Sequence, residues 1–101
     1  MNEVYISGKI VKLPQYVFSP ETDYFHFLLQ VTFFDSSDQI VINNFVVTTY
    51  NQNAKWAIHH LHLGDEILIK GMLNSIQIEN TKPTVISASQ IIIVQHALDN
   101  R

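Results

Sequence analysis

The segment that decides the fold is KWAIHHLHLGDEILIKG, from Lys55 to Gly71. Its first half places apolar residues at helical spacing, and Gly64 marks the expected end of that helix. An N-terminal cap is expected at Asn51 or Asn53. From Asp65 onward the period becomes that of a strand. The change of period therefore predicts a short helix followed directly by a strand.

Outward from this segment, alternating and β-branched patterns predict four further strands. They are expected at Val4 to Val11, Tyr24 to Phe34, Gln39 to Tyr50 and Thr84 to Val94. A proline-containing connection from Lys12 to Asp23 is read as a loop. The order of three strands, one helix and two strands predicts an all-β protein, a five-stranded OB-fold barrel with one α-helix between strands 3 and 4. Glycines inside strands 1 and 4 are read as tight corners. Another small β-barrel is the alternative.

The chain of 101 residues has room for one domain. We expect an OB-fold domain at residues 1–95 and a short C-terminal tail at residues 96–101. The absence of cysteine excludes disulfides and thiolate metal sites. The opening residues do not have the pattern of a signal peptide, and no apolar run has membrane-spanning length. We therefore expect a cytoplasmic protein that does not contact membranes.

The net charge is -3, with only six lysine and arginine residues. Nucleic-acid binders usually carry a basic excess, so any such function must work with few phosphate contacts. No nucleophile with a base, glycine-rich phosphate loop or pair of carboxylates is recognisable, and we expect no enzymatic activity and no cofactor.

Three segments together resemble the bacterial single-stranded DNA-binding protein (SSB) family and its relative, the primosomal protein PriB. They are MNEVYISGKIV, SPETDYFHFLLQVT and TTYNQNAKWAIHHLHLGDEILIKGML. The spacing from Tyr50 to Gly64 to Gly71 is that of the family, and the resemblance covers about residues 2 to 94. The family's acidic tail with a hydrophobic tip does not match the final ALDNR, and PriB also lacks that tail. The resemblance therefore favours a PriB-like or minor SSB-like protein.

The resemblance implies binding of single-stranded DNA, with RNA as an alternative, by base stacking and lysine–phosphate contacts. Tyr50 matches a stacking aromatic of the family, whereas Asn44 and Ile78 stand where the family usually has other aromatics. The outward faces of the first three strands and the two flanking loops supply the remaining candidates. The expected nucleic-acid-binding residues are Tyr5, Lys9, Lys12, Tyr16, Phe18, Phe34, Asn44, Thr48, Tyr50 and Lys82.

A second hypothesis is an OB-fold module for protein–protein interaction or assembly that has lost most nucleic-acid binding. The acidic balance and the replaced stacking positions motivate it. Exposed tyrosine and phenylalanine also mark protein interfaces. Under either hypothesis we expect a homodimer or homotetramer, with replication or recombination proteins as candidate partners.

His59 and His62 lie three residues apart on the predicted helix. A catalytic zinc site needs three protein ligands and a structural one needs four. His26 and His96 belong to other predicted elements. We therefore expect a polar helix face and no metal site.

Overall fold

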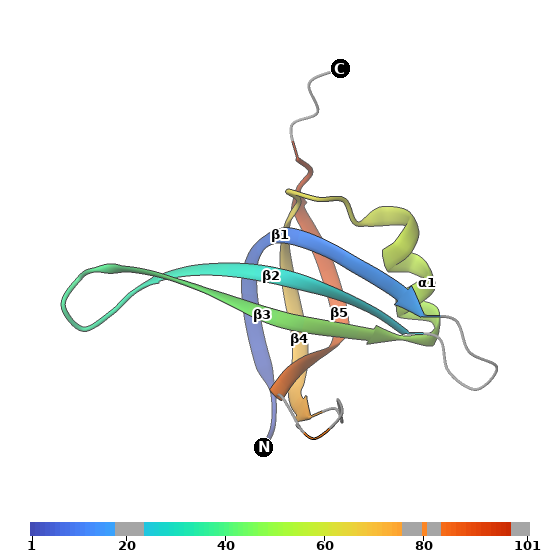
Figure 1. Ribbon diagram of the computed structural model, residues 1–101, viewed down its shortest axis with the longest axis horizontal. Coiled ribbons are helices and arrows are strands. Elements are labelled where there is room, and N and C mark those ends of the chain that lie inside the picture. The colour runs from blue at the N-terminus through green and yellow to red at the C-terminus, as the bar shows by residue number, and fades with distance from the viewer. Residues whose placement is uncertain (18–23, 76–79, 81–83, 98–101) are drawn as a thin grey trace.

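The computed structural model describes residues 1–17, 24–75, 80 and 84–97. Its elements are β1 (Val4–Val17), β2 (Tyr24–Phe34), β3 (Ile40–Tyr50), α1 (Asn51–His60), β4 (Glu66–Ser75) and β5 (Thr84–Gln95). The strands close into a barrel in the order β1-β2-β3-β5-β4 (Figure 1). All neighbours are antiparallel except β3 and β5, which run parallel. The predicted OB-fold barrel, with its helix between strands 3 and 4, is confirmed.

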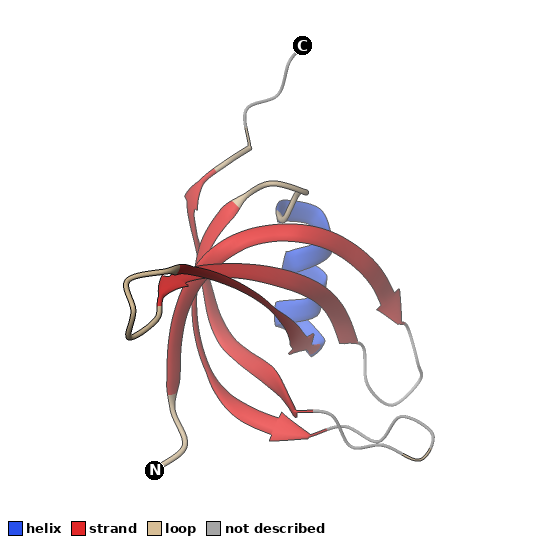
Figure 2. Cartoon of the chain, turned by 60° about the vertical axis from the view of Figure 1, so that its left-hand side comes forward, coloured by secondary structure: helices blue, strands red, loops and turns tan. Residues whose placement is uncertain are grey.

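The core fills the barrel with the inward residues of every strand. Phe25, Phe27 and Leu29 alternate along β2 with partly exposed residues, and they join Ile67 and Ile69 of β4 in one cluster. Ala54 and Ala57 of α1 join the same cluster, as does Leu61 just after the helix, so α1 packs its two small residues against the core. Figure 2 shows α1 lying beside the strands of the barrel. The inward faces of the strands therefore form the core, and the outer faces are left to contact a ligand or a partner.

β1 changes partner along its length. Its first half pairs with β4 and its second half with β2, and Lys9 is paired with both Glu66 and Gln30. At the change of partner, a Cβ atom on Gly8 would lie 2.4 Å from the carbonyl oxygen of Gln30. Only glycine lets the two backbones approach this closely. Gly71 on β4 has an equally close neighbour, since a Cβ there would lie 2.2 Å from the carbonyl oxygen of Ser87. The two glycines that were read as tight corners thus lie where neighbouring backbones approach each other closely.

β1 is longer than predicted. The strand continues to Val17, through the segment that was read as a loop from Lys12. Its pairing with β2 shifts register between Ile10 and Lys12 and again between Lys12 and Gln15. Proline is tolerated where a ladder is interrupted in this way, because its missing N–H is not required there. A proline inside the segment therefore did not end the strand.

The ends of α1 also differ from the prediction. The N-cap residue is Tyr50, and no side chain makes a capping hydrogen bond there. Asn53 instead donates from Nδ2 to the carbonyl oxygen of Ser89. The helix stops at His60, and Gly64 (φ +90°) follows in the turn before β4, where its N–H donates to the carbonyl oxygen of Ile10. Within the described residues, no helix is long and apolar enough to cross a membrane.

The β2–β3 hairpin extends beyond the barrel as a long arm (Figure 1). Its turn is closed by Asp35, whose Oδ1 accepts hydrogen bonds from the backbone N–H groups of Ser37 and Gln39. Phe33 continues the alternation of the inward residues of β2 but is 40% exposed, because the arm has left the core at this point. Phe34 and Ile40, paired at the end of the arm, are exposed as well.

Candidate nucleic-acid interface

An aromatic cluster lies on the outer face of the barrel where β2 begins and β3 ends. Tyr24 and Tyr50 are paired across the two strands, with ring centroids 6.3 Å apart. His26 lies two residues along β2, and its ring meets Tyr24 edge to face at 4.8 Å. All three side chains are half-buried. Alternation explains this placement, because Phe25 and Phe27 point into the core and turn their neighbours outward. Tyr24, His26 and Tyr50 are called the tyrosine–histidine cluster below.

The same outer face continues along β2 and β3 to the end of the arm. Successive outward pairs run from Tyr24 and Tyr50, past Gln30 and Asn44, to Phe34 and Ile40. Phe34 is 69% exposed. Ten residues of strand at about 3.3 Å each separate Tyr24 from Phe34, a length of about 33 Å. This surface, the outer β2–β3 face, therefore carries aromatic rings at both ends and amides between them.

A polar row crosses the barrel beside this face. Asn44 is paired with Gln30, Gln30 with Lys9, and Lys9 with Glu66. Lys9, Gln30 and Glu66 also line an open hollow of about 610 Å³. Lys12 lies further along β1, where it is exposed and paired with Leu28 of β2. Lys9 and Lys12 thus place positive charge at the border of the outer β2–β3 face, and Glu66 offsets part of it.

Tyr5 is directed to a different part of the barrel. It is paired with Lys70 on the β1–β4 wall, and its hydroxyl donates to Oε1 of Glu3 at 2.9 Å. Nζ of Lys70 lies 3.4 Å from the same oxygen and 5.8 Å from the centroid of the Tyr5 ring. Hydrogen bonds from Tyr5 and Lys70 lower the pKa of the Glu3 carboxyl, and Glu3 raises the pKa of the Lys70 ammonium. Tyr5 and Tyr50 were predicted to share one binding surface, but the structure places Tyr5 on a different wall from Tyr50.

Thr48 is the clearest correction. It was expected on the exposed face, but its exposed fraction is 0%. Its paired neighbours are His26 on β2 and Ser87 on β5, and its Oγ1 lies 3.4 Å from Oγ of Ser87. Because β3 has a partner strand on each edge here, the short threonine side chain is enclosed in a row of three. Thr48 stabilises the closure of the barrel and is not available to a ligand.

The model of the family described as "Single-strand binding protein family" matches residues 1–98. The chain belongs to the single-strand binding protein family. Among curated protein sequences no significant match is found.

Two solved structures have a similar fold. One is the SSB domain of a protein from Synechococcus sp., with 18% identity, a TM-score of 0.70, and coverage of 90% of this chain and 93% of that chain. The other is a small single-stranded DNA-binding protein from Streptomyces coelicolor, with 24% identity, a TM-score of 0.74, and coverage of 92% and 94%. At 18% and 24% identity, the similarity to these two structures establishes the fold alone.

Two of the predicted site residues, Phe18 and Lys82, lie outside the described residues, as does Ile78. Tyr16 lies in β1, where its backbone is paired with Phe25, and not in a loop as predicted. The structure thus places Lys9, Lys12, Asn44, Tyr50 and Phe34 along one surface, with Tyr5 on the β1–β4 wall and Thr48 buried between His26 and Ser87.

Tyr24 and His26 belong to this face but are absent from the predicted site. The signal was their alternation with Phe25 and Phe27, which places them beside the paired end of β3. Among the described residues, Nδ1 of His26 is buried without a hydrogen-bond partner. Burial also lowers the pKa of the imidazole, so the ring is held in its neutral form. A neutral ring beside two tyrosines adds to the stacking surface without adding charge.

Proposed function

We propose that this family member is a non-catalytic protein that binds single-stranded DNA along the outer β2–β3 face. Bases stack on Tyr50, Tyr24 and Phe34, and phosphates contact Lys9 and Lys12. The observation that carries the proposal is the Tyr24–Tyr50 pair, two half-buried rings side by side at 6.3 Å on an outer surface. Aromatic rings beside a basic border are the usual platform for single strands on OB-folds. Family membership and the single-stranded DNA-binding neighbour from Streptomyces coelicolor support it.

The dimensions of the face fit a strand of moderate length. A stacked strand advances about 3.4 Å per nucleotide, so about 33 Å holds about ten nucleotides. Sites on OB-folds range from about 4 to 16 nucleotides. Each stacked base contributes about 1–3 kcal/mol, so three rings supply useful affinity even though cations are few. Stacking, rather than charge, is therefore the main source of binding for a chain of net charge -3.

A salt-series titration tests the proposal. Fluorescent oligo-dT of about 12 nucleotides is titrated with the protein at several salt concentrations, beside duplex DNA and oligo-U of the same length. Single-stranded DNA is expected to bind more tightly than duplex. With phosphate contacts from Lys9 and Lys12, the log–log salt slope is about -1.4, since each contact on a single strand contributes about -0.7. Absence of binding to oligo-dT even at low salt would exclude this function.

The alternative function is an assembly module, and the exposed apolar arm favours it. Phe34, Ile40 and Ile42 are each more than half exposed at the end of the β2–β3 hairpin. Such residues are enriched where protein surfaces meet. We infer that the chain forms a homodimer or homotetramer, with replication or recombination proteins as further partners. Sedimentation of the wild-type protein over a concentration series checks the assembly, and association without DNA binding would select this alternative.

The PriB-like type is the finer assignment that we propose within the family. The support is the composition of the helical segment NQNAKWAIHHLH, rich in asparagine, glutamine and histidine. Replacement of the usual second and third stacking aromatics by Asn44 and Ile78 points the same way. Weaker binding per nucleotide than in family members with all the aromatics is the expected consequence.

A further inference from the structure

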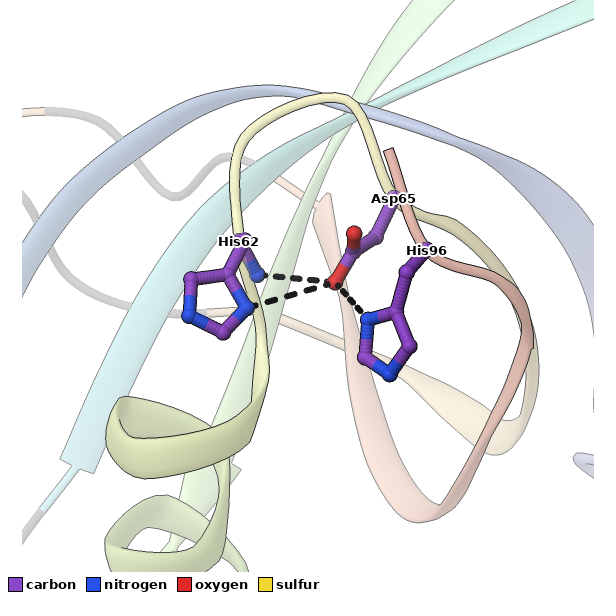
Figure 3. Close-up of side chains that lie close together, drawn as sticks. All are labelled: His62, Asp65 and His96. Carbon is purple, nitrogen blue, oxygen red and sulfur yellow. Dashed lines mark hydrogen bonds and ion pairs between the residues drawn. The ribbon is translucent and has the colours of Figure 1, made fainter. Parts of the chain in front are cut away.

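Two side chains of the turn between α1 and β4 meet a third side chain, which follows β5, beside the C-terminal end of α1. His62 follows the helix, Asp65 precedes β4, and His96 follows β5 (Figure 3). Nδ1 of His96 lies 3.4 Å from Oδ2 of Asp65, and Nδ1 of His62 lies 3.8 Å from the same oxygen. One donor atom from each residue lies within 4.8 Å of the others.

The carboxylate at the centre is fixed by the backbone. Asp65 is fully buried, its Oδ2 accepts from the N–H of His62 at 2.9 Å, and its Oδ1 accepts from the N–H of Ala97 at 2.8 Å. The N–H of Asp65 donates in turn to the carbonyl oxygen of His62 at 3.1 Å. Each carboxylate oxygen has a second lone pair, so Oδ2 can still bind a cation. One ligand is therefore rigid before any ion arrives.

The two imidazoles, by contrast, are free to adjust. The side chains of His62 and His96 are 68% and 63% exposed, and their ring centroids are 6.2 Å apart. A capped turn needs the buried carboxylate but neither ring. The two rings nevertheless direct the same nitrogen, Nδ1, toward one carboxylate oxygen (Figure 3). This convergence is what a turn alone leaves unexplained.

We propose that Nδ1 of His62, Oδ2 of Asp65 and Nδ1 of His96 bind Zn²⁺, with water completing the coordination. Zinc binds imidazole nitrogen and carboxylate oxygen at about 2.0–2.2 Å, so neighbouring ligand atoms in a tetrahedron lie about 3.4 Å apart. The His96–Asp65 distance already has this value. The His62–Asp65 distance of 3.8 Å exceeds it slightly, and rotation of the exposed His62 ring closes the difference.

The surroundings leave space for the water and set the strength of the site. His96 borders an open hollow of about 340 Å³ that is also lined by Lys9 and Glu66. The carboxylate of Glu66 offsets the charge of Lys9, so the neighbouring side chains do not make the site strongly repulsive to a cation. Two imidazoles favour zinc over magnesium or calcium, which prefer oxygen ligands.

The bound ion would fasten the residues after β5 to the turn between α1 and β4. The spacing of His59 and His62 on the helix pointed away from metal binding, because it offered only two ligands. Folding changes the ligand set, since it brings His96 to the turn that holds His62 and Asp65 and leaves His59 on the exposed surface of α1. The proposal does not depend on the function proposed above.

Calorimetric titration of the full chain with ZnCl2, after treatment with a chelator, tests the site. We expect one zinc ion per chain and a Tm that rises with zinc but not with equal magnesium or calcium. His62→Ala and His96→Ala should each weaken binding by at least about tenfold. His59→Ala, an exposed helix histidine outside the cluster, is the matched control and should bind like the wild type.

Two results would overturn the proposal. One is a wild-type chain that shows no zinc heat and no Tm shift at about 100 μM ZnCl2. The other is zinc binding that is unchanged in both His62→Ala and His96→Ala, because the ion would then bind elsewhere; its loss in His59→Ala would place the ion on α1. Circular dichroism of each variant without zinc checks that the barrel is intact, which is expected because both histidines are exposed.

Discussion

Tyr24, the first residue of β2, lies beside Tyr50, the last residue of β3, with ring centroids 6.3 Å apart. The two rings meet because Tyr24, at the start of β2, is paired with Tyr50, at the end of β3, and paired residues point to the same face of the sheet. Neither ring is needed for the core, which is filled from the opposite face. The two rings are therefore free to contact a ligand, and removing one changes the surface without opening a cavity.

Tyr50→Ala is expected to weaken oligo-dT binding about 5- to 150-fold, the equivalent of about 1–3 kcal/mol for one stacked base. Tyr5→Ala is the matched control, since it removes an equally large ring from the β1–β4 wall. It should change affinity by less than about twofold. Fluorescence anisotropy measures both. If Tyr5→Ala has the larger effect, the ligand lies over β1 and β4 instead.

Phe34→Ala should affect long and short strands differently. Phe34 lies about 33 Å from Tyr24, so a strand of about four nucleotides on the tyrosine–histidine cluster does not reach it. We expect an affinity loss for oligo-dT of about 12 nucleotides and none for about 4 nucleotides. Equal losses for the two lengths would mean that the arm acts through assembly, which sedimentation of the variant would then reveal.

Lys9→Gln should reduce the salt dependence of binding. One phosphate contact fewer lowers the magnitude of the log–log slope by about 0.7. Lys70→Gln is the control, because Lys70 is held by Glu3 on the β1–β4 wall. Its slope should equal that of the wild type. A slope reduced by Lys70→Gln and not by Lys9→Gln would place the phosphates on the opposite side of β1.

Gly8→Ala should destabilise the barrel by about 1–3 kcal/mol, the usual cost of forcing extra volume into a packed site. The added Cβ would meet the backbone oxygen of Gln30 at 2.4 Å, and a backbone atom cannot rotate away. Ser7→Ala, at the neighbouring exposed position, should stay within about 0.5 kcal/mol of the wild type. Urea unfolding followed by circular dichroism gives both free energies. Equal midpoints for the two variants would show that β1 can bend without glycine.

His26 should make the free energy of unfolding depend on pH. Burial lowers its folded-state pKa below the ordinary value of 6.5, so the unfolded chain takes up the proton first. The stability associated with the neutral ring is complete above about pH 6.5 and is lost as the pH falls through the lower folded-state pKa. His26→Gln should therefore lose less stability on acidification than the wild type. His59→Gln, at an exposed helix position, should follow the wild-type curve, and a wild-type-like curve for His26→Gln would contradict this reasoning.

Local periodicity predicted most of the architecture. The change of period at Gly64 and Asp65 located α1 and β4, because amphipathic spacing depends only on neighbouring residues. The same reasoning misread residues 12–17, since proline normally ends a strand and the register shifts that tolerate it depend on β2.

The site was less accessible to sequence reasoning because it depends on contacts between distant segments. Alternation placed Thr48 outside, but its burial follows from having His26 on one edge and Ser87 on the other. Tyr5 and Tyr50 both face outward, yet they lie on different walls of the barrel. Tyr5 is in the part of β1 that pairs with β4, whereas Tyr50 is paired with β2. The contact of His96 with Asp65 arises only when the barrel closes.

The position of β5 in the barrel also governs when the chain can fold during synthesis. β5 lies between β3 and β4, so neither strand has its second partner until the last strand has left the ribosome. Until then the β2–β3 hairpin can form, but the edges of β3 and β4 stay open to other chains. A chain truncated before β5 should therefore aggregate rather than persist as a smaller folded unit.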